Sequence, residues 1–399
     1  MLLALHTKYW MNREDILKEV LSLKGKNFLF EMATGVGKSR IAIEKIKTFN
    51  IKTLLIVVPR NVLKQTWKNE INKWWKDNKL NISFTTYISF PKYVGKWDAI
   101  IYDECHHLSE RCREVIPDFN CSHSLLLSAT VNRELKKELS YCFNPLTQYK
   151  INLKEAIGDI LPDPKVFLIP LELDNKIKSE TIYKNKNADG KLITIDYSQR
   201  WNYKNVKTPL AIKCTEAQYN MDISNLIDWY KTKYMNTRNP IIKNIWLMKC
   251  NERLKWLSTR KTTIVYNILK KFKNKRTLVF CSSILQTEAL GRYCINSQNR
   301  YASEYLQDFN NGKINHITAC NVLNEGINLV NCQVGIYANL NSSETIVAQR
   351  CGRLLRHPDP IIIIPYYKNT REEELMKKML ENYNPKLITT VSLNDYLNK

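Results

Sequence analysis

The sequence predicts an α/β protein with two lobes, each built on a parallel β-sheet, and a basic, largely helical region between them. Two series of short apolar segments alternate with helical patterns: 28–31, 53–58, 82–87, 99–102 and 125–128, then 277–281, 316–320, 334–338 and 361–366. Apolar strands that alternate with helices are typical of parallel sheets covered on both faces. We expect a first domain over 1–150, a linker or insertion over 151–270, a second domain over 271–385 and a tail over 386–399.

Length and composition agree with this organisation and limit the class of protein. A chain of 399 residues has room for two or three domains, and 44% hydrophobic with 10% aromatic residues is typical of a globular protein. A disordered basic tail, a collagen-like protein and a disulfide framework are therefore excluded. The net charge of +23, from 61 Lys and Arg against 38 Asp and Glu, favours a polyanionic partner, nucleic acid first and an anionic membrane second.

The sequence predicts a cytoplasmic protein. Its longest apolar runs, such as 360–367, are far shorter than the roughly 18 residues of a membrane-spanning helix. The N-terminal residues have neither a basic region nor a small-residue cleavage site typical of secretion. Eleven cysteines without a C-x-x-C pair argue against a zinc ribbon or an iron–sulfur cluster and indicate reduced thiols.

A β-hairpin is predicted at the start of the region between the lobes. Asp189 and Gly190 favour a tight turn, and strand-like segments flank them at 181–184 and 192–197. A mainly helical stretch over 211–275 follows.

This helical stretch contains much of the positive charge. The window 231–280 holds fourteen Lys or Arg against Glu252 alone, a net charge of +13. Aromatic residues lie among these charges: Trp229, Tyr230, Tyr234, Trp246 and Trp256. Basic side chains that follow phosphates and rings that stack on bases would guide a nucleic acid. A helix core of aromatic residues with a solvated basic face explains the same pattern equally well.

A glycine-rich turn over 33–39 lies between a strand and an amphipathic segment at 40–49. Small residues let backbone N–H groups converge on phosphates at a helix N-terminus, where Lys38 would reach the β- and γ-phosphates and Ser39 would bind Mg²⁺. The general pattern has glycine in place of Met32, and an ordinary capping turn is the alternative. The predicted nucleotide-binding residues here are Thr34, Gly35, Val36, Gly37, Lys38, Ser39 and Arg40.

Two carboxylates follow the apolar strand at 99–102. At the carboxyl end of a parallel strand, Asp103 can hold Mg²⁺ through its water shell while Glu104 polarises an attacking water. A polar loop after a strand is the alternative. A metal cluster at 105–107, Cys-His-His, is disfavoured because three consecutive side chains cannot converge on one ion.

The segment 347–356 presents three hydrogen-bond donors with helical spacing. Gln349, Arg353 and Arg356 stand at i, i+4 and i+7, so they share one helix face. From across a cleft they could clamp a γ-phosphate as arginine fingers do. A solvated basic helix face is the alternative.

In this order, these segments resemble the motif set of superfamily 2 helicases and translocases. The matching segments are 33–39 (motif I), 57–60 with Leu63 (motif Ia), 103–106 (motif II, as Asp-Glu-Cys-His), 128–130 (motif III), 278–282 (motif IV), 324–328 (motif V) and 349–356 (motif VI). The resemblance covers nearly the whole chain. It departs at Asn328, where many relatives carry Asp, and over 6–13, where no Q-motif glutamine stands upstream of motif I.

The resemblance implies two RecA-like domains that close on ATP and Mg²⁺, with His106 and Thr130 helping to couple hydrolysis to movement. It adds Gly326 to the nucleotide-binding residues and Ser39 with Asp103 as the metal site. The implied catalytic residues are Lys38, Asp103, Glu104, Gln349, Arg353 and Arg356. The implied nucleic-acid contacts are Pro59, Arg60, Thr86, Tyr87, Ser282 and Asn324.

The predicted function is ATP-dependent unwinding or remodelling of single-stranded, forked or branched DNA in repair, recombination or replication. The Asp-Glu-Cys-His-His box, Pro59-Arg60 and the helical block before Thr277 resemble restriction-type, repair and branch-migration motors more than DEAD-box RNA helicases. An RNA helicase and an ATP-gated nucleic-acid clamp are the alternatives. Intact motif I, II and VI residues argue against a clamp, which need not keep the groups that activate water.

Overall fold

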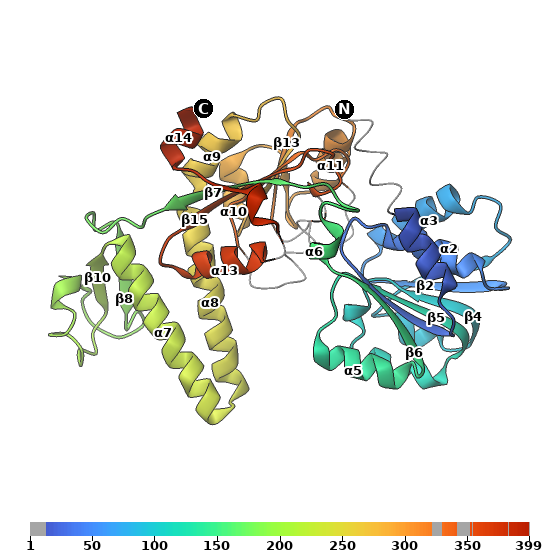
Figure 1. The fold of residues 1–399 in the computed structure, drawn as a ribbon. Coiled ribbons are helices and arrows are strands. Elements are labelled where there is room, and N and C mark those ends of the chain that lie inside the picture. Colours follow the sequence, from blue (N-terminus) through green and yellow to red (C-terminus); the bar gives the residue numbers. More distant parts are fainter. Residues whose placement is uncertain (1–12, 321–328, 341–351, 353, 382, 399) are drawn as a thin grey trace.

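The computed structural model describes residues 13–320, 329–340, 352, 354–381 and 383–398. They form two α/β lobes, a small mixed sheet and a projecting pair of helices (Figure 1). The predicted fold class of two parallel-sheet lobes is confirmed. None of the helices in this described part combines the length and the apolar character needed to cross a membrane.

The first lobe is built on six described parallel strands in the order β3-β2-β4-β5-β1-β6. The strands are β1 (Asn27–Met32), β2 (Thr53–Val58), β3 (Asn81–Thr86), β4 (Lys96–Tyr102), β5 (Asn120–Ser128) and β6 (Leu146–Ile151). The helices are α2 (Lys38–Lys47), α3 (Val62–Trp74), α4 (Glu110–Glu114), α5 (Arg133–Cys142) and α6 (Leu153–Ala156), and residues 13–22 are also helical.

The central strands explain why this lobe forms. In β2, Leu54, Ile56 and Val58 enter one apolar core while Leu55 and Val57 enter a second core on the other face of the sheet. Full burial of such a side chain contributes about 1.5–3 kcal/mol. A continuous apolar strand is therefore stable only where both faces of the sheet are covered.

The second lobe is built on seven described parallel strands in the order β12-β13-β11-β14-β15-β7-β16. The strands are β7 (Lys165–Leu171), β11 (Thr277–Phe280), β12 (Cys294–Ile295), β13 (His316–Ala319), β14 (Val334–Tyr337), β15 (Ile361–Tyr367) and β16 (Ile388–Thr390). The helices are α9 (Thr262–Lys270), α10 (Ile284–Leu290), α11 (Ala302–Asn310), α13 (Arg371–Leu380) and α14 (Leu393–Asn398).

Two strands of this sheet lie in ranges expected to be linker and tail. β7 pairs in parallel with β15 from Lys165 to Leu171 and also with β16, so it lies inside the second sheet. Its Val166 and Ile169 are buried in the cores on the two faces of that sheet. The sequence does not predict this strand, because proline is unusual within a central strand. Pro170 lies inside β7, and Pro162 and Pro164 lie just before it.

The predicted hairpin over 181–197 is wrong. β8 (Glu180–Lys184) and β9 (Ile193–Asp196) do not pair with each other, because β10 (Leu210–Cys214) lies between them. β10 pairs antiparallel with β8 and parallel with β9. Its Leu210, Ile212 and Cys214 are buried in a small core, and this apolar strand therefore takes the central position.

Two long helices, α7 (Glu216–Thr237) and α8 (Pro240–Arg260), pack against each other and project from the second lobe as an arm (Figure 1). Arg238 ends α7 in the left-handed conformation, and the Asn239 side chain caps α8 by accepting from the Ile241 N–H. Near the tip the arm has little core, because its buried residues are Ile223, Ile227, Leu257 and Ser258.

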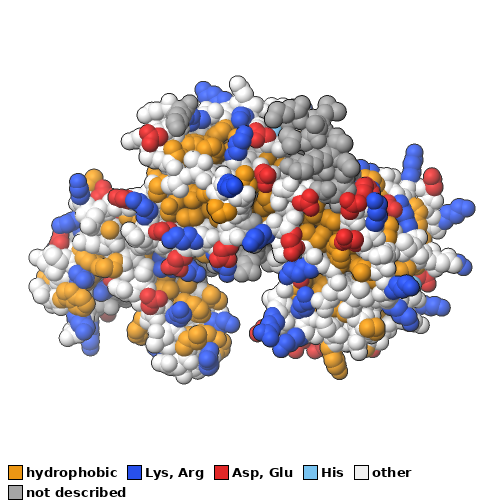
Figure 2. Space-filling view, in the orientation of Figure 1, with side chains coloured by type: hydrophobic (Ala, Val, Ile, Leu, Met, Phe, Trp, Pro, Cys, Tyr) orange, Lys and Arg blue, Asp and Glu red, His pale blue; other side chains and the backbone are white. Residues whose placement is uncertain are grey.

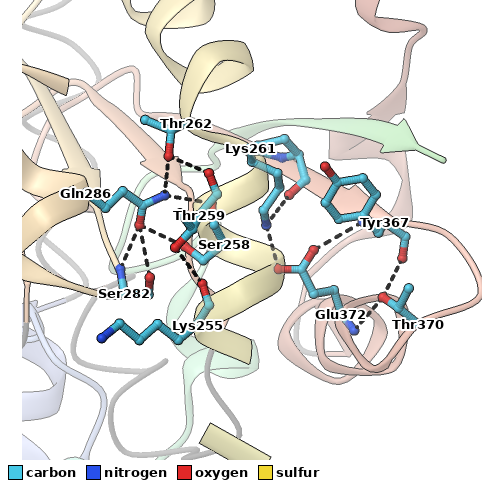
Figure 3. A network of polar contacts seen from close by, with 11 residues as sticks. Lys255, Ser258, Thr259, Lys261, Thr262, Ser282, Gln286, Tyr367, Thr370 and Glu372 are labelled. Carbon is cyan, nitrogen blue, oxygen red and sulfur yellow. Dashed lines mark hydrogen bonds and ion pairs between the residues drawn. The ribbon is translucent and has the colours of Figure 1, made fainter. Parts of the chain in front are cut away.

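The base of the arm is fixed to the second lobe by two buried polar groups (Figure 3). The Gln286 Oε1 atom accepts hydrogen bonds from the Ser258 hydroxyl and the Ser282 N–H, both at 2.9 Å, and its Nε2 donates to the Ser258 carbonyl at 2.7 Å. Nearby, the Lys261 ammonium lies 2.6 Å from the Glu372 carboxylate, and both side chains are fully buried. The arm is therefore continuous with the second lobe.

Candidate functional site

The glycine-rich segment between β1 and α2 makes a tight turn at the carboxyl end of the first sheet. Gly35 and Gly37 have φ angles of +98° and +108°, in the left-handed region that favours glycine. Lys38, the first residue of α2, donates from Nζ to the Met32 carbonyl at 3.1 Å and so lies over the turn. The Thr34 hydroxyl is buried, and among the described residues it has no hydrogen-bond partner.

The two predicted carboxylates follow β4 at the same edge of the sheet. The Glu104 carboxylate lies 4.0 Å from the Lys38 Nζ through Oε1 and 3.5 Å from the His106 Nδ1 through Oε2. Glu104 adopts the left-handed conformation with φ of +49°, which is strained for a residue with a β-carbon. The strained turn therefore brings a carboxylate from β4 to the helix that follows β1.

Asp103 is held in a desolvated environment. Burial raises its pKa to about 6, and the neighbouring charge of Glu104 adds to the shift. The Trp67 indole opposes the shift by donating from Nε1 to Asp103 Oδ2 at 2.8 Å. The Tyr87 hydroxyl donates to the Asp103 backbone carbonyl at 2.7 Å. Both the side chain and the backbone of Asp103 are thus fixed by neighbouring aromatic residues.

A hydrogen-bonded chain joins the segment after β4 to the segment after β5. The His106 Nδ1 lies 3.0 Å from the Ser128 hydroxyl, and that hydroxyl donates to the Thr130 carbonyl at 2.8 Å. A serine hydroxyl has one hydrogen, so Nδ1 of His106 carries the proton in this arrangement. The predicted coupling residues His106 and Thr130 are therefore connected through Ser128.

The two lobes meet at the glycine-rich turn. A β-carbon built on Gly352 would lie 2.5 Å from the Thr34 carbonyl oxygen, and one built on Gly35 would lie 3.2 Å from the Gly352 carbonyl oxygen. From the first lobe, Arg13 donates to the Gly35 carbonyl at 3.0 Å. Gly352 of the second lobe therefore lies close against the backbone of motif I at Thr34.

Arg356 adds electrostatic interactions between the two lobes. Burial lowers the pKa of Arg13, and the charges of Arg356 and Arg40 lower it further. The Arg356 side chain is exposed, partial desolvation lowers its pKa, and the charge of Glu70 opposes that shift. Arg356 of the second lobe thus lies within electrostatic reach of Arg13 and Glu70 of the first lobe.

Comparison with known proteins identifies the family to which this site belongs. A family model for the res subunit of type III restriction enzymes matches residues 9–90, and one for the helicase conserved C-terminal domain matches residues 260–358. A protein named DNA 3'-5' translocase XPB2 from Sulfurisphaera tokodaii is 23% identical over 386 residues, 90% of this chain and 82% of its own length. These matches support a superfamily 2 helicase or translocase related to restriction-type enzymes.

Solved structures of other proteins share the fold. S. cerevisiae Dbp5, bound to RNA and ADP BeF3, matches with a TM-score of 0.61 and 10% identity over 96% of this chain and 90% of its own. The Pyrococcus furiosus Hef helicase domain matches with a TM-score of 0.50 and 13% identity over 92% of this chain and 97% of its own. The helicase C-terminal family match and the translocase relative, rather than these structures, support an ATP-hydrolysing translocase or helicase that acts on nucleic acid.

Other predicted residues of the superfamily 2 motifs fall into several groups, and among them Ser282 donates from its N–H and its hydroxyl to Gln286 Oε1. Pro59, Arg60 and Thr86 lie at the carboxyl ends of β2 and β3, and Arg60 is exposed. Tyr87 is only 6% exposed and its hydroxyl is bonded to Asp103, so this placement does not support the predicted nucleic-acid contact. Gln349, Arg353, Asn324 and Gly326 lie outside the described residues.

Two residues of this superfamily 2 site were not predicted from the sequence. Trp67 contacts Asp103, and Arg13 contacts Gly35. The spacing of Leu63, Trp67 and Ile71 does indicate a buried helix face, but it cannot show that an indole N–H reaches a carboxylate on another strand.

Proposed function

We propose that the chain is a DNA-dependent motor. ATP hydrolysis between the two lobes would drive the protein along DNA or drive separation of the DNA strands. The surroundings of Glu104 support this best, because its carboxylate lies between Lys38 and His106. The backbone contact of Gly352 with Thr34 brings the second lobe to the same turn. Groups suited to binding phosphate and to activating water therefore occur together at the junction of the lobes.

Each side chain then has a defined part in hydrolysis. Lys38 would exchange the Met32 carbonyl for the β- and γ-phosphates of ATP. Glu104 would accept a proton from the attacking water. His106 contacts both Glu104 and the Ser128 hydroxyl, so it would couple a movement of Glu104 to the Ser128 segment. Arg356 would bring positive charge from the second lobe, with Gln349 and Arg353 as further donors.

Mg²⁺ fits the residues at this site. The Ser39 hydroxyl and the Asp103 carboxylate are oxygen donors of the kind that Mg²⁺ binds, usually together with several waters. Two adjacent carboxylates repel each other here, which contributes to the raised pKa of Asp103, and the Glu104 Oε2 atom has no hydrogen-bond partner among the described residues. A bound divalent cation would supply charge neutralisation beside the phosphates.

DNA is the proposed track. The relative from Sulfurisphaera tokodaii bears the name of a DNA translocase, and the match over residues 9–90 is to a restriction-enzyme subunit. The net charge of +23 suits any nucleic acid. RNA, and a clamp that binds without moving, are the outcomes that the first experiment below separates from this proposal.

The arm is proposed to guide the DNA backbone. Lys231, Lys233, Arg238 and Lys243 near its tip are exposed, and the Lys233 ammonium lies 4.7 Å from the centroid of a Trp229 ring that is 52% exposed. Basic and hydrophobic side chains lie side by side on the arm, next to an opening between the arm and the first lobe (Figure 2). Such a surface suits phosphates and unstacked bases.

The DNA assignment is tested by ATPase and strand-displacement assays with single-stranded RNA, single-stranded DNA, forked DNA and RNA duplexes. We expect DNA to stimulate hydrolysis most and Lys38→Ala to abolish it. Glu104→Gln should keep ATP binding and lower the stimulated rate by a factor on the order of 100 or more. Greater stimulation by RNA would overturn the DNA assignment, and unchanged hydrolysis in Glu104→Gln would overturn its role.

The guiding role of the arm is tested by reversing charge at four positions, Lys231→Glu, Lys233→Glu, Arg238→Glu and Lys243→Glu. We expect weaker DNA binding and a shallower dependence of affinity on salt, by about 0.7–0.9 in the logarithmic slope for each lost phosphate contact. The matched control reverses four exposed lysines near the amino ends of β1, β2 and β4: Lys24, Lys26, Lys52 and Lys96. Equal effects in the two variants would leave net charge, rather than the arm, as the cause.

A further inference from the structure

We propose that Trp67 is a positioning residue that links nucleic-acid binding at the start of α3 to the metal-binding carboxylate of Asp103. This inference rests on the proposed function, because it assumes that Asp103 serves a Mg²⁺-nucleotide and that Arg60 contacts the nucleic acid.

The first step is the contact itself. Trp67 is 2% exposed, and its Nε1 lies 2.8 Å from Asp103 Oδ2. An indole has one N–H donor, so this bond uses the whole hydrogen-bonding capacity of the side chain. A hydrogen bond to an ionised carboxylate is also stronger than one between neutral groups. The position of the indole therefore determines where that carboxylate oxygen lies.

The second step is the place of Trp67 on α3. This helix begins at Val62, two residues after Arg60, which with Pro59 is a predicted nucleic-acid residue. Trp67 lies less than two turns from that end, on a buried face shared with Leu63 and Ile71. A displacement of the exposed N-terminal end is therefore transmitted to the indole by a rigid, packed helix.

The third step is how the far end of α3 is held. The Lys47 ammonium of α2 donates to the Trp74 carbonyl at 2.5 Å, and the Arg40 guanidinium stacks 4.4 Å from the centroid of the Trp74 ring. Since α2 begins at Lys38, α3 is held against the helix of the nucleotide-binding turn. Glu70 of α3 also interacts electrostatically with Arg356 of the second lobe and opposes the desolvation that lowers the pKa of that arginine.

A second connection ends at the same aspartate. Tyr87 directly follows the predicted nucleic-acid residue Thr86, and its hydroxyl donates to the Asp103 backbone carbonyl at 2.7 Å. Two segments expected to contact nucleic acid in the first lobe thus reach Asp103, one at its carboxylate and the other at its backbone. Nucleic acid bound to these segments would hold Asp103 in the arrangement that receives a Mg²⁺-nucleotide.

The test uses Trp67→Phe in the full-length chain, because phenylalanine keeps a buried ring and removes the donor. Calorimetry measures ADP affinity with Mg²⁺ and with EDTA, each with and without forked DNA. We expect wild type to bind Mg²⁺-ADP more tightly than ADP alone, and DNA to increase that difference. In Trp67→Phe the contribution of Mg²⁺ should fall on the order of tenfold and the effect of DNA should shrink, while ADP affinity in EDTA stays unchanged.

Trp97→Phe is the matched control. Trp97 lies near the opposite end of β4 and donates its indole N–H to the Tyr93 carbonyl at 3.0 Å, away from the site. An unchanged Mg²⁺ contribution in Trp67→Phe, or an equal loss with Mg²⁺ and with EDTA, would overturn the positioning role. If wild type bound no Mg²⁺-ADP or did not respond to DNA, the proposed function would be wrong and the inference would fall with it.

Discussion

Gly352 of the second lobe contacts Thr34 of the first so closely that a β-carbon on Gly352 would stand 2.5 Å from the Thr34 carbonyl oxygen. Backbone atoms cannot move aside as the end of a flexible side chain can. The two lobes therefore approach each other at a point where one of them must present a glycine.

Gly352→Ala should separate the lobes and lower DNA-stimulated ATP hydrolysis. We expect a decrease of at least about tenfold in kcat, since a misplacement of about 1 Å can cost a factor of 100. ADP binding, which depends on the glycine-rich turn of the first lobe, should change little. Gly291→Ala is the control, because a β-carbon at Gly291 would meet nothing within 4 Å. Normal stimulated hydrolysis in Gly352→Ala would contradict this account.

Lys261→Met should destabilise the second lobe. Lys261 and Glu372 are both fully buried and 2.6 Å apart, so loss of the ammonium leaves an unpaired carboxylate among apolar residues. Removal of one partner of such a pair costs about 3–5 kcal/mol, which urea unfolding can measure. Lys249→Met, which breaks a partly exposed pair with Glu252, should cost about 1 kcal/mol or less. Similar losses of unfolding free energy in the two variants would mean that the buried pair stabilises the protein no more than the partly exposed pair does.

Asp103→Asn should stabilise the metal-free protein at neutral pH. The pKa of Asp103 is about 6 in the folded protein and about 3.9 in an unfolded chain, so the folded state binds the proton more tightly. This preference favours folding below about pH 4 and is lost as the pH rises through about 6. Unfolding in EDTA should therefore give Asp103→Asn an advantage of about 2–3 kcal/mol at pH 7.5 and much less at pH 4.5. An advantage independent of pH would exclude the buried charge as its cause.

Gln286→Leu should loosen the base of the arm. The change removes the acceptor of the Ser258 hydroxyl and the Ser282 N–H, and the donor to the Ser258 carbonyl. Buried groups left without partners cost about 1–3 kcal/mol each, so we expect a loss of about 2 kcal/mol or more in urea unfolding. Gln65→Leu on exposed α3 surface should be nearly neutral. If Gln286→Leu were equally neutral, the network would not hold the arm.

Local patterns in the sequence account for most of the fold and for the groups that carry the chemistry. Apolar strands such as β2 and β4, and the small residues before Lys38, are short segments whose conformation depends on their own residues. The closeness of Lys38 and Glu104 follows from one rule, that the carboxyl ends of parallel strands meet at one edge of the sheet.

The features that escaped prediction depend on residues far apart in the chain. β10 takes the place between β8 and β9 that the predicted hairpin left out, and its Leu210, Ile212 and Cys214 are buried in the core there. Tyr87 and Trp67 contact Asp103 through tertiary packing, and the spacing of residues within each segment does not reveal such contacts. The position of β7 in the second sheet depends on β15, which lies beyond the whole arm.

That position of β7 has a consequence for synthesis on the ribosome. The strands of the first lobe are complete once Ile151 has emerged, so this lobe can fold while translation continues. β7 emerges next, but its neighbours β15 and β16 end only at Tyr367 and Thr390. For about half of translation, therefore, the nascent chain displays a seven-residue strand with two unpaired edges. A product truncated after the arm would keep that strand exposed and would be prone to aggregation or capture by chaperones.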